Sequence, residues 1–417
     1  MAEARPRLAV VYGRAAITPM ELFEAARPVA ELLWLMDAAD DVLSPLLPLI
    51  RRMGAVLDTA GRSDEEVVAM LEPQPPEGVI VFAEPQLALA AQIAERFDLR
   101  FHRPPVAALL TNKARQRAGL AAGGLPGPRF WPLGAGADAA ERQRLAAELP
   151  YPVVLKPQEG LGSRQTTLVP DAPTLAALLA DFDSSPEDML IEELLEESRP
   201  RAEQRLGETL MVDTLSGGGR RVHHTICGHF IPAPPFRGAG TFTPIHLADA
   251  ETAAVLEATE AALAALDIEH GFTNTDLILT PDGPRVLEVN GRIGGEVPAL
   301  RALLGAPGLL REAIRFAVGA PGVEVAPLET SQVAFCVNCQ APAEARRLRG
   351  LSGLDDVSAL EGVTSVVVHR RAGDPIDWRI GTMSRLCAVY GVVGDHERLH
   401  ELHGEVERLV VPDYETD

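Results

Sequence analysis

The segment from Gly271 to Gly295 limits the possible folds of this chain more than any other feature. It predicts two apolar-rich strands on either side of a turn at Pro281–Pro284. Asp276 lies on the first strand, whereas Glu288 and Asn290 lie two residues apart on the second and therefore share one face. Carboxylate and amide oxygens suit a hard divalent cation such as Mg2+. The pattern predicts a β-hairpin with a metal site on one face.

Arg292 lies two residues beyond Asn290 and extends the same face toward the strand end. Three glycines surround it in the sequence, Gly291, Gly294 and Gly295. A solvated hairpin with alternating polar residues is the alternative interpretation. It does not account for three glycines gathered around one arginine, so we predict that Arg292 belongs to a functional site.

Lys113 and Lys156 are the two lysines of the 417 residues, although the chain has 38 lysines and arginines together. A lysine ammonium is a compact point charge, which suits a phosphate group differently from the planar fork of arginine. Lys113 opens a predicted helix and Lys156 ends a predicted buried strand. Because they belong to different elements, the two lysines can meet only in the folded chain.

The loop after Lys156 lies between predicted strands at Val153–Leu155 and Thr166–Val169. It contains Gly160, Gly162, Ser163 and Arg164. Backbone N–H groups of such a loop can surround phosphate oxygens, while the lysine at the strand end supplies positive charge. Most glycine-bearing hairpins are simple turns, so this pattern gains its meaning from the neighbouring lysines.

The remaining sequence predicts an α/β protein. Buried strands at Arg7–Gly13 and Gly78–Phe82 and an alanine-rich helical run to Phe97 predict a parallel sheet at the N-terminal end. A final helix is predicted after Asp395, which is a typical N-cap residue. The predicted strands of the C-terminal region are Ser331–Cys339, Val363–His369 and Leu386–Val393.

Composition excludes several classes of partner. The net charge of −21 and pI near 4.9 would repel nucleic-acid phosphates. The sequence has no apolar run of membrane-spanning length and no signal-peptide pattern, so we expect a cytoplasmic protein without a membrane partner. Cys336 and Cys339 have metal-site spacing, but no second pair accompanies them, and residues three apart on a strand face opposite sides. We expect reduced, structural cysteines.

Together and in this order, the motifs resemble those of the ATP-grasp superfamily of carboxylate–amine ligases. The segment Glu288-x-Asn290-x-Arg292, followed by Gly294 and Gly295, most resembles the L-amino acid ligase branch, which makes dipeptides and related amides. The resemblance implies an ATP-grasp fold of three parts. These are a parallel α/β pre-grasp domain at 1–105, an ATP-grasp domain at 106–325 and a small C-terminal α+β domain at 330–417. Within the second part, the lid would cover about 125–215 and the central sheet about 216–325.

The resemblance also implies the role of each candidate residue toward ATP. Lys113 and Lys156 would bind the nucleotide phosphates beneath the glycine loop. Glu192 would face the adenine amino group, with Glu193 to Leu195 as the adenine hinge. Glu208 would hold the ribose, although an apparent insertion at 198–206 changes the usual spacing. The implied nucleotide ligands are Lys113, Lys156, Gly160, Gly162, Ser163, Glu192, Glu193, Leu195 and Glu208.

The implied metal ligands are Asp276, Glu288 and Asn290, which would hold Mg2+, with Mn2+ as a substitute. Many relatives have a glutamate where this chain has Asp276, so the number of ions stays open. The implied catalytic residues are Lys156, Glu288 and Arg292. The implied substrate contacts are Arg237, Arg292, Gly294 and Gly295.

These roles predict an ATP-dependent ligase that joins a carboxylic acid, such as an amino acid, to an amine. An acyl phosphate would form first, and the products would be an amide, ADP and phosphate. Two alternatives stay open: a ligase that activates bicarbonate or formate, as in purine pathways, and a nucleotide-binding regulatory protein without turnover. The resemblance further implies a homodimer with small-molecule substrates, which fits specialised metabolism.

Overall fold

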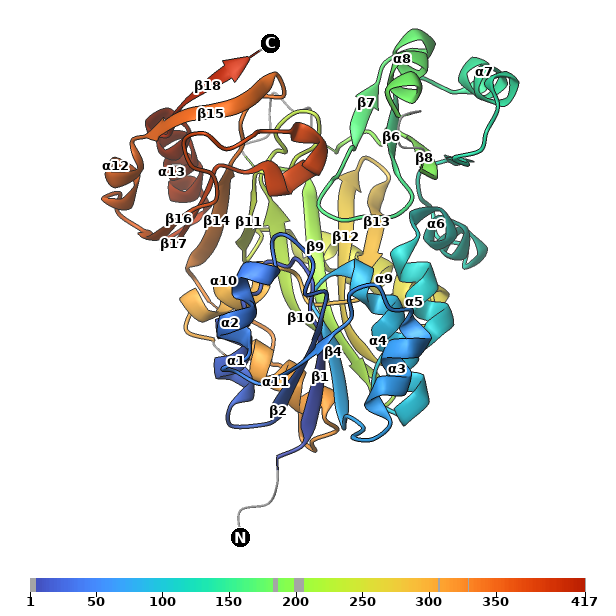
Figure 1. The fold of residues 1–417 in the computed structure, drawn as a ribbon. Helices are drawn as coiled ribbons and strands as arrows, with labels where there is room; N and C mark the ends of the chain where they lie inside the picture. Colours follow the sequence, from blue (N-terminus) through green and yellow to red (C-terminus); the bar gives the residue numbers. More distant parts are fainter. Residues whose placement is uncertain (1–4, 183–186, 199–205, 307, 329, 417) are drawn as a thin grey trace.

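The structure is a computed structural model, and it describes residues 5–182, 187–198, 206–306, 308–328 and 330–416. Its elements form an N-terminal parallel sheet, a small lid sheet and a large antiparallel sheet that extends into the C-terminal region (Figure 1). This is an α/β fold, as the sequence predicts. Among the described residues, no helix has the length and apolar character needed to cross a membrane.

The N-terminal sheet has four parallel strands in the order β3-β2-β1-β4. Its alternate side chains enter two separate cores, with Leu8 and Trp34 on one face and Ala9 and Leu35 on the other. Helices cover both faces, as expected for a parallel sheet. The strands are β1 (Arg7–Val11), β2 (Glu31–Met36), β3 (Ala55–Asp58) and β4 (Gly78–Val81).

Helices from distant parts of the chain cover this sheet. On the Trp34 face, α1 packs with α11, which comes from residues far along the chain. On the Leu35 face, α3 packs with α4. Two short helical pieces, η1 and η2, follow β2 and β4. The bounds are α1 (Pro19–Ala26), η1 (Ser44–Leu46), α2 (Leu47–Ile50), α3 (Asp64–Leu71), η2 (Glu84–Gln86), α4 (Leu87–Phe97) and α11 (Leu309–Ala317).

The predicted lid range contains an antiparallel sheet in the order β5-β8-β6-β7 with a small core of its own, which we call the lid below. Two helices, α5 and α6, connect the N-terminal sheet to the lid (Figure 1). The lid strands are β5 (Phe130–Leu133), β6 (Val153–Pro157), β7 (Thr167–Val169) and β8 (Met189–Glu193). The helices are α5 (Pro104–Thr111), α6 (Lys113–Ala122), α7 (Ala139–Glu148) and α8 (Ala172–Phe182).

The large sheet has eight antiparallel strands in the order β13-β12-β9-β10-β11-β14-β17-β16. The pairing of β11 with β14 joins the central strands to those of the C-terminal region. Although residues 209–215 of β9 lie within the predicted lid range of 125–215, this strand pairs with β10 and β12. The strands are β9 (Thr209–Gly217), β10 (Arg220–His229), β11 (Gly240–Thr243), β12 (Gly271–Thr280), β13 (Gly283–Asn290), β14 (Val333–Cys339), β16 (Val363–Val368) and β17 (Cys387–Val393).

The predicted hairpin is confirmed as β12 and β13, and the three predicted C-terminal strands as β14, β16 and β17. Asp395 caps the predicted final helix, because its side chain accepts a hydrogen bond of 2.8 Å from the Arg398 amide. A two-stranded sheet of β15 and β18 was not anticipated. The remaining elements are α9 (Asp249–Ala265), α10 (Val297–Leu303), β15 (Ala345–Ser352), α12 (Leu354–Ser358), η4 (Trp378–Ser384), α13 (His396–Leu409) and β18 (Val411–Thr416).

Candidate active site

The first lysine meets both the glycine loop and the metal-site hairpin. Asn112 caps α6 by accepting a 3.0 Å hydrogen bond from the Arg115 amide, which fixes Lys113 in the first turn. The Lys113 ammonium lies 2.9 Å from Glu288 Oε1 and donates to the Gly160 carbonyl at 2.9 Å. One side chain therefore joins α6, the glycine loop and the end of β13.

The second lysine belongs to a buried ionic cluster with Glu192 and Arg117. Lys156 Nζ lies 2.6 Å from Glu192 Oε2, and Arg117 Nε lies 2.5 Å from Glu192 Oε1. Burial raises the pKa of Glu192, but the charges of Lys156 and Arg117 outweigh it and lower this pKa to about 2. The Arg117 guanidinium also donates to the carbonyls of Val286 and Leu287 on β13. Glu192 is thus an ionised carboxylate between two cations.

Glu288 links the two lysines electrostatically. Burial raises the pKa of Glu288, but the charges of Lys113 and Lys156 reverse this effect and hold it below its usual value. The cluster as a whole contains three cations, Lys113, Lys156 and Arg117, and two carboxylates. An excess of positive charge in a largely buried place favours an anion such as a polyphosphate.

The loop between β6 and β7 has the backbone that the glycines predict. Gly160 and Gly162 have φ angles of 121° and 62°, and Ser163 follows with a φ of 59°. These values lie in the left-handed region that glycine favours. Arg164 turns within the lid toward Glu187, with Nη2 2.5 Å from Oε2. Among these loop residues, the backbone around Gly160 is the part in contact with Lys113.

The predicted metal ligands lie together on the hairpin. Asp276 pairs with Glu288 across the two strands, and Asn290 Nδ2 donates to Asp276 Oδ2 at 3.3 Å. His229 of β10 adds a fourth polar group, with Nε2 3.7 Å from Asp276 Oδ1. No group of three or more His, Cys, Asp and Glu side chains in the described ranges could hold a metal. Two carboxylates and an amide oxygen nevertheless fit Mg2+, which retains water and phosphate oxygens as ligands.

Arg292 connects the hairpin to the N-terminal domain. Its guanidinium lies 2.6 Å from Glu84 Oε1, and Glu84 is buried directly after β4. Burial lowers the pKa of Arg292, but Glu84 and the nearby carboxylates of Asp276 and Asp213 raise it overall. Arg292 is therefore a permanently charged group that a carboxylate at the end of the N-terminal sheet holds in place.

The glycines after Arg292 are required by close packing. A Cβ atom on Gly294 would lie 2.7 Å from Val297 Cγ2, and one on Gly295 would lie 2.9 Å from Ala16 Cβ. The amide of Gly294 donates to both oxygens of Asp213 at 3.1 Å. Burial raises the pKa of Asp213 to about 7. Asp213 thus holds the turn that follows Arg292 and titrates near neutrality.

Most of the remaining residues predicted to bind nucleotide or substrate have hydrogen-bond or ion-pair partners of their own. Glu193 pairs with Arg129 at 3.1 Å, and Leu195 is half-buried beyond the end of β8. Glu208 is buried before β9 and accepts a hydrogen bond from Ser198. Arg237 is buried in the loop after β10, where its Nε donates to the Pro234 carbonyl at 2.9 Å. The hydrogen bonds and ion pairs given above for these residues go to partners outside the ionic cluster.

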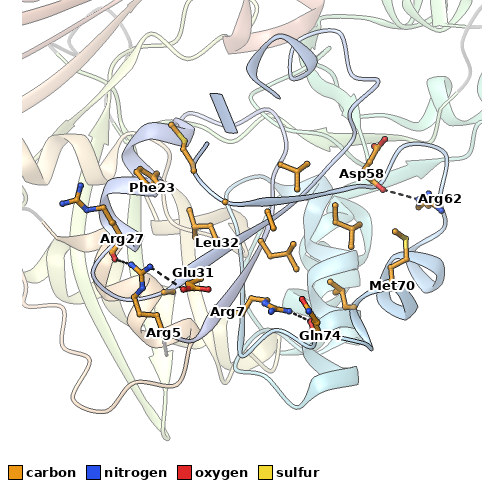
Figure 2. A pocket seen from close by; sticks show the side chains of 18 residues that line it. Arg5, Arg7, Phe23, Arg27, Glu31, Leu32, Asp58, Arg62, Met70 and Gln74 are labelled. Carbon is orange, nitrogen blue, oxygen red and sulfur yellow. Dashed lines mark hydrogen bonds and ion pairs between the residues drawn. The ribbon is translucent and has the colours of Figure 1, made fainter. Parts of the chain in front are cut away.

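A cavity also lies away from the candidate site. Figure 2 shows a cavity of about 670 Å³ beside the edge of the N-terminal sheet, along β2 and β3. Two of its arginines have partners, because Arg5 lies 3.6 Å from Glu31 and Arg7 donates to the Gln74 carbonyl at 2.8 Å. None of the predicted site residues lines this cavity, so we do not assign the chemistry to it.

Sequence reasoning missed Arg117, Glu84, Asp213 and His229. A signal for Arg117 existed, since it follows Lys113 by four residues and shares its helix face. A signal for Glu84 existed as well, because ligand sites gather at the carboxyl ends of parallel strands. Asp213 and His229 carry no local signal, since each lies on a strand and gains its partners from other parts of the chain.

Comparison with protein families identifies the fold. The ATP-grasp domain family matches residues 111–296, which include the lysines, the glycine loop and the hairpin. The L-amino acid ligase of Bacillus licheniformis superposes with a TM-score of 0.76 at 20% identity, covering 100% of both chains. N5-carboxyaminoimidazole ribonucleotide synthetase of Thermotoga maritima superposes with a TM-score of 0.70 at 16% identity, covering 98% of this chain and 100% of the other.

Curated proteins are similar to this chain in sequence over shorter ranges. The uncharacterized protein y4rH of Sinorhizobium fredii is 32% identical over 308 residues, or 72% of this chain and 60% of that protein. The carbamoyl phosphate synthase large chain of Mycobacterium tuberculosis is 30% identical over 205 residues, or 48% of this chain and 17% of the other. Carnosine synthase 1 of Gallus gallus is 34% identical over 119 residues, covering 28% and 13%. The chain thus spans less than two thirds of each curated relative.

The fold and the matched domain define the class of protein. Residues 111–296 match the ATP-grasp domain family, and the chain as a whole has the ATP-grasp fold. The predicted ATP-grasp fold, with its parallel N-terminal sheet, is confirmed.

Proposed function

We propose that this protein is an ATP-dependent ligase that forms an amide bond between a carboxylic acid and an amine. The observation that carries the proposal is the position of Arg292. It lies at the end of the strand that bears Glu288 and Asn290, and it is held from the N-terminal domain by Glu84. A fixed cation beside a phosphate and metal site is what activation of a carboxylate by phosphoryl transfer needs.

The first half of the reaction is phosphoryl transfer to the acid. Lys113, Lys156 and the backbone of the glycine loop would bind the ATP phosphates, and the cluster's excess positive charge supports this role. Asp276, Glu288 and Asn290 would hold Mg2+, which neutralises phosphate charge when it is bound. The acid's carboxylate oxygen attacks the γ-phosphorus and ADP leaves, giving an acyl phosphate.

The second half is attack by the amine on the activated carbonyl. The new C–N bond forms, the C–O bond to phosphate breaks, and the amine loses a proton. Arg292 would stabilise the phosphate oxygens and the oxyanion that develops on the carbonyl. Closure of the lid over the site would exclude water and so limit hydrolysis of the acyl phosphate. Gly294 and Gly295 would border the substrates through their backbone, since Val297 and Ala16 fill the space that their side chains would take.

The amino acid class of substrate is favoured by the whole-chain similarity to an L-amino acid ligase and by the relative named carnosine synthase. A second candidate is a ligase that activates bicarbonate. The similarities to a carbamoyl phosphate synthase and to a carboxyaminoimidazole ribonucleotide synthetase favour it. Both candidate functions would use the same phosphate and metal residues, so they differ in which acid the enzyme activates.

The test is ADP release from ATP and Mg2+ in the presence of pools of amino acids, with hydroxylamine as a small amine. ADP formation with one pool, together with the matching hydroxamate by mass spectrometry, would support the amide-forming ligase. ADP formation with bicarbonate alone would favour the second candidate. ATP binding without turnover on any acid would favour a regulatory protein.

Two variants assign the activity to this site. We expect Lys156→Ala and Glu288→Gln to abolish ADP release, since they remove a phosphate ligand and a metal ligand. Asp282→Asn is the matched control for Glu288→Gln, because Asp282 lies on the same hairpin with 84% of its side chain exposed. Full activity in Lys156→Ala or Glu288→Gln would show that the site is wrongly assigned.

A further inference from the structure

A short segment of the C-terminal region, η4 (Trp378–Ser384), touches the glycine loop of the lid. The Thr382 amide donates to the Gly162 carbonyl at 2.7 Å, and the Gln165 amide donates to the Arg379 carbonyl at 2.9 Å. These backbone hydrogen bonds join segments more than two hundred residues apart in the sequence. They hold the loop that lies over Lys113 against the rest of the molecule.

The approach of the two backbones depends on a glycine. Gly381 has a φ of 68°, and a Cβ atom there would lie 2.1 Å from the Gly162 oxygen and 2.7 Å from the Arg164 amide nitrogen. Any side chain at position 381 would therefore push the glycine loop away. The two backbones can approach this closely only with glycine at position 381. A residue with a side chain would be strained at this φ angle and would clash with the glycine loop.

The same segment also touches the loop between β10 and β11, which carries Arg237 and is called the Arg237 loop below. Thr382 Oγ1 accepts a hydrogen bond of 2.8 Å from the Gly238 amide. Gln340 Nε2 strengthens this junction by donating to the carbonyls of Gly238 at 3.0 Å and Thr382 at 3.2 Å. Thr382 is thus bonded through its amide to the nucleotide loop and through its hydroxyl to the Arg237 loop.

The Arg237 guanidinium has one nitrogen, Nη1, without a hydrogen-bond acceptor among the described residues. Arg237 is 2% exposed. A buried guanidinium N–H without an acceptor is costly, and a carboxylate is its best partner. An acid bound there would stabilise the conformation of this loop, including the Gly238 amide that Thr382 holds.

The lid core contains no residue of the Arg237 loop among the described residues. It consists of lid residues such as Leu155 and Ile191, and no described residue of the C-terminal region belongs to it. Among the described interactions, the hydrogen bonds of Thr382, which Gln340 reinforces, link the Arg237 loop to the glycine loop. Such a small polar junction can couple two sites without moving whole domains.

We propose that Thr382 is a positioning residue that couples the glycine loop of the nucleotide site to the Arg237 loop. Ordering of one loop stabilises the other, so nucleotide and acid favour each other's binding. The proposal rests on the nucleotide site of the proposed function. It adds a residue of the C-terminal region, beyond the ATP-grasp domain match, to the parts that control the reaction.

The test is hydrogen exchange followed by mass spectrometry, with ADP and Mg2+ as the probe. In the wild-type chain we expect ADP to slow exchange in 159–166, in 377–385 and also in 233–239. In Thr382→Val, which keeps the side-chain shape but lacks the hydroxyl, ADP should still protect 159–166. Its effect on 233–239 should fall about fivefold or more, the lower range of allosteric coupling.

Matched variants separate coupling from general damage. Thr382→Ser keeps Oγ and should restore protection of 233–239, whereas Ile380→Ala changes an exposed residue of the same segment and should behave as wild type. Gly381→Ala should weaken protection of 159–166 itself. Reduced ADP binding in that variant alone, with an unchanged melting temperature, would identify the backbone contact as the cause.

The outcomes distinguish this proposal from the proposed function. Protection of 159–166 without any effect on 233–239 in the wild type would overturn the coupling and leave the ligase intact. Equal protection of 233–239 in wild type and Thr382→Val would also overturn it. Absence of protection at 159–166 in the wild type would overturn both, because nucleotide would not bind at the glycine loop.

Discussion

Replacement of Glu192 by glutamine is the sharpest test of the ionic cluster. The change keeps the shape of the side chain and removes the charge that lies between Lys156 and Arg117 at 2.6 and 2.5 Å. Lys156 and Arg117 would then lose the carboxylate that lies between them, and Glu288 would be the remaining carboxylate of the cluster. Removing one partner from a buried ionic cluster is strongly destabilising, because the charges that remain are uncompensated.

The magnitude follows from the pKa of Glu192, which falls from 4.5 to about 2 on folding. That difference corresponds to about 3 kcal/mol of stability at neutral pH. Because the folded pKa lies below the unfolded one, this stability is present above about pH 4.5 and is lost as the pH falls toward 2. For a chain of this length, about 3 kcal/mol lowers the melting temperature by about 3 °C.

Differential scanning calorimetry at neutral pH without nucleotide measures this effect, and the adjacent residue supplies the control. Glu193→Gln removes a carboxylate that pairs with an exposed arginine, Arg129, so water screens the loss and the melting temperature should change little. If Glu192→Gln melted at the same temperature as Glu193→Gln, the cluster would not contribute to stability as argued. Equal stability of Glu192→Gln and wild type would refute the reasoning in the same way.

Two further predictions concern pH and metal. Asp213 has a pKa raised to about 7 in the folded chain, so its contribution to stability is lost as the pH rises from about 4 to 7. Asp213→Asn should flatten the fall in melting temperature over that range, whereas the exposed Asp282→Asn should retain it; an unchanged slope in Asp213→Asn would contradict the assignment. Removal of Mg2+ with a chelator should weaken ADP binding about tenfold or more in wild type and much less in Asp276→Asn, measured by calorimetric titration. An equal loss in both would show that Asp276 holds no metal.

Local patterns were enough to predict much of the fold. The alternating apolar residues and the turn predicted the hairpin of β12 and β13. The capping side chain of Asp395 predicted the start of α13. The contact of Lys113 with the loop after Lys156 needed more, namely the resemblance to a family, because the two lysines lie in separate elements. These features depend on residues that are near one another in sequence or on a known order of motifs.

Long-range contacts explain what could not be predicted. Asp213 gains its role from the backbone amide of Gly294 and the side-chain amide of Asn274, which lie on other elements. The pairing of β11 with β14 joins two regions that the pattern separates by a proline-rich stretch near 321–327. Nothing within either segment encodes its partner, since a half-buried strand accepts many neighbours equally well.

The position of α11 has a consequence for how the chain folds during synthesis. Its buried residues, among them Leu309 and Ile314, share one core with Leu8 and Trp34 of the first two strands. The first hundred residues therefore leave the ribosome with one face of their sheet covered only in part, by α1 and α2. The rest of that face stays open until the chain has grown past residue 317, so the nascent domain needs protection from aggregation for most of translation.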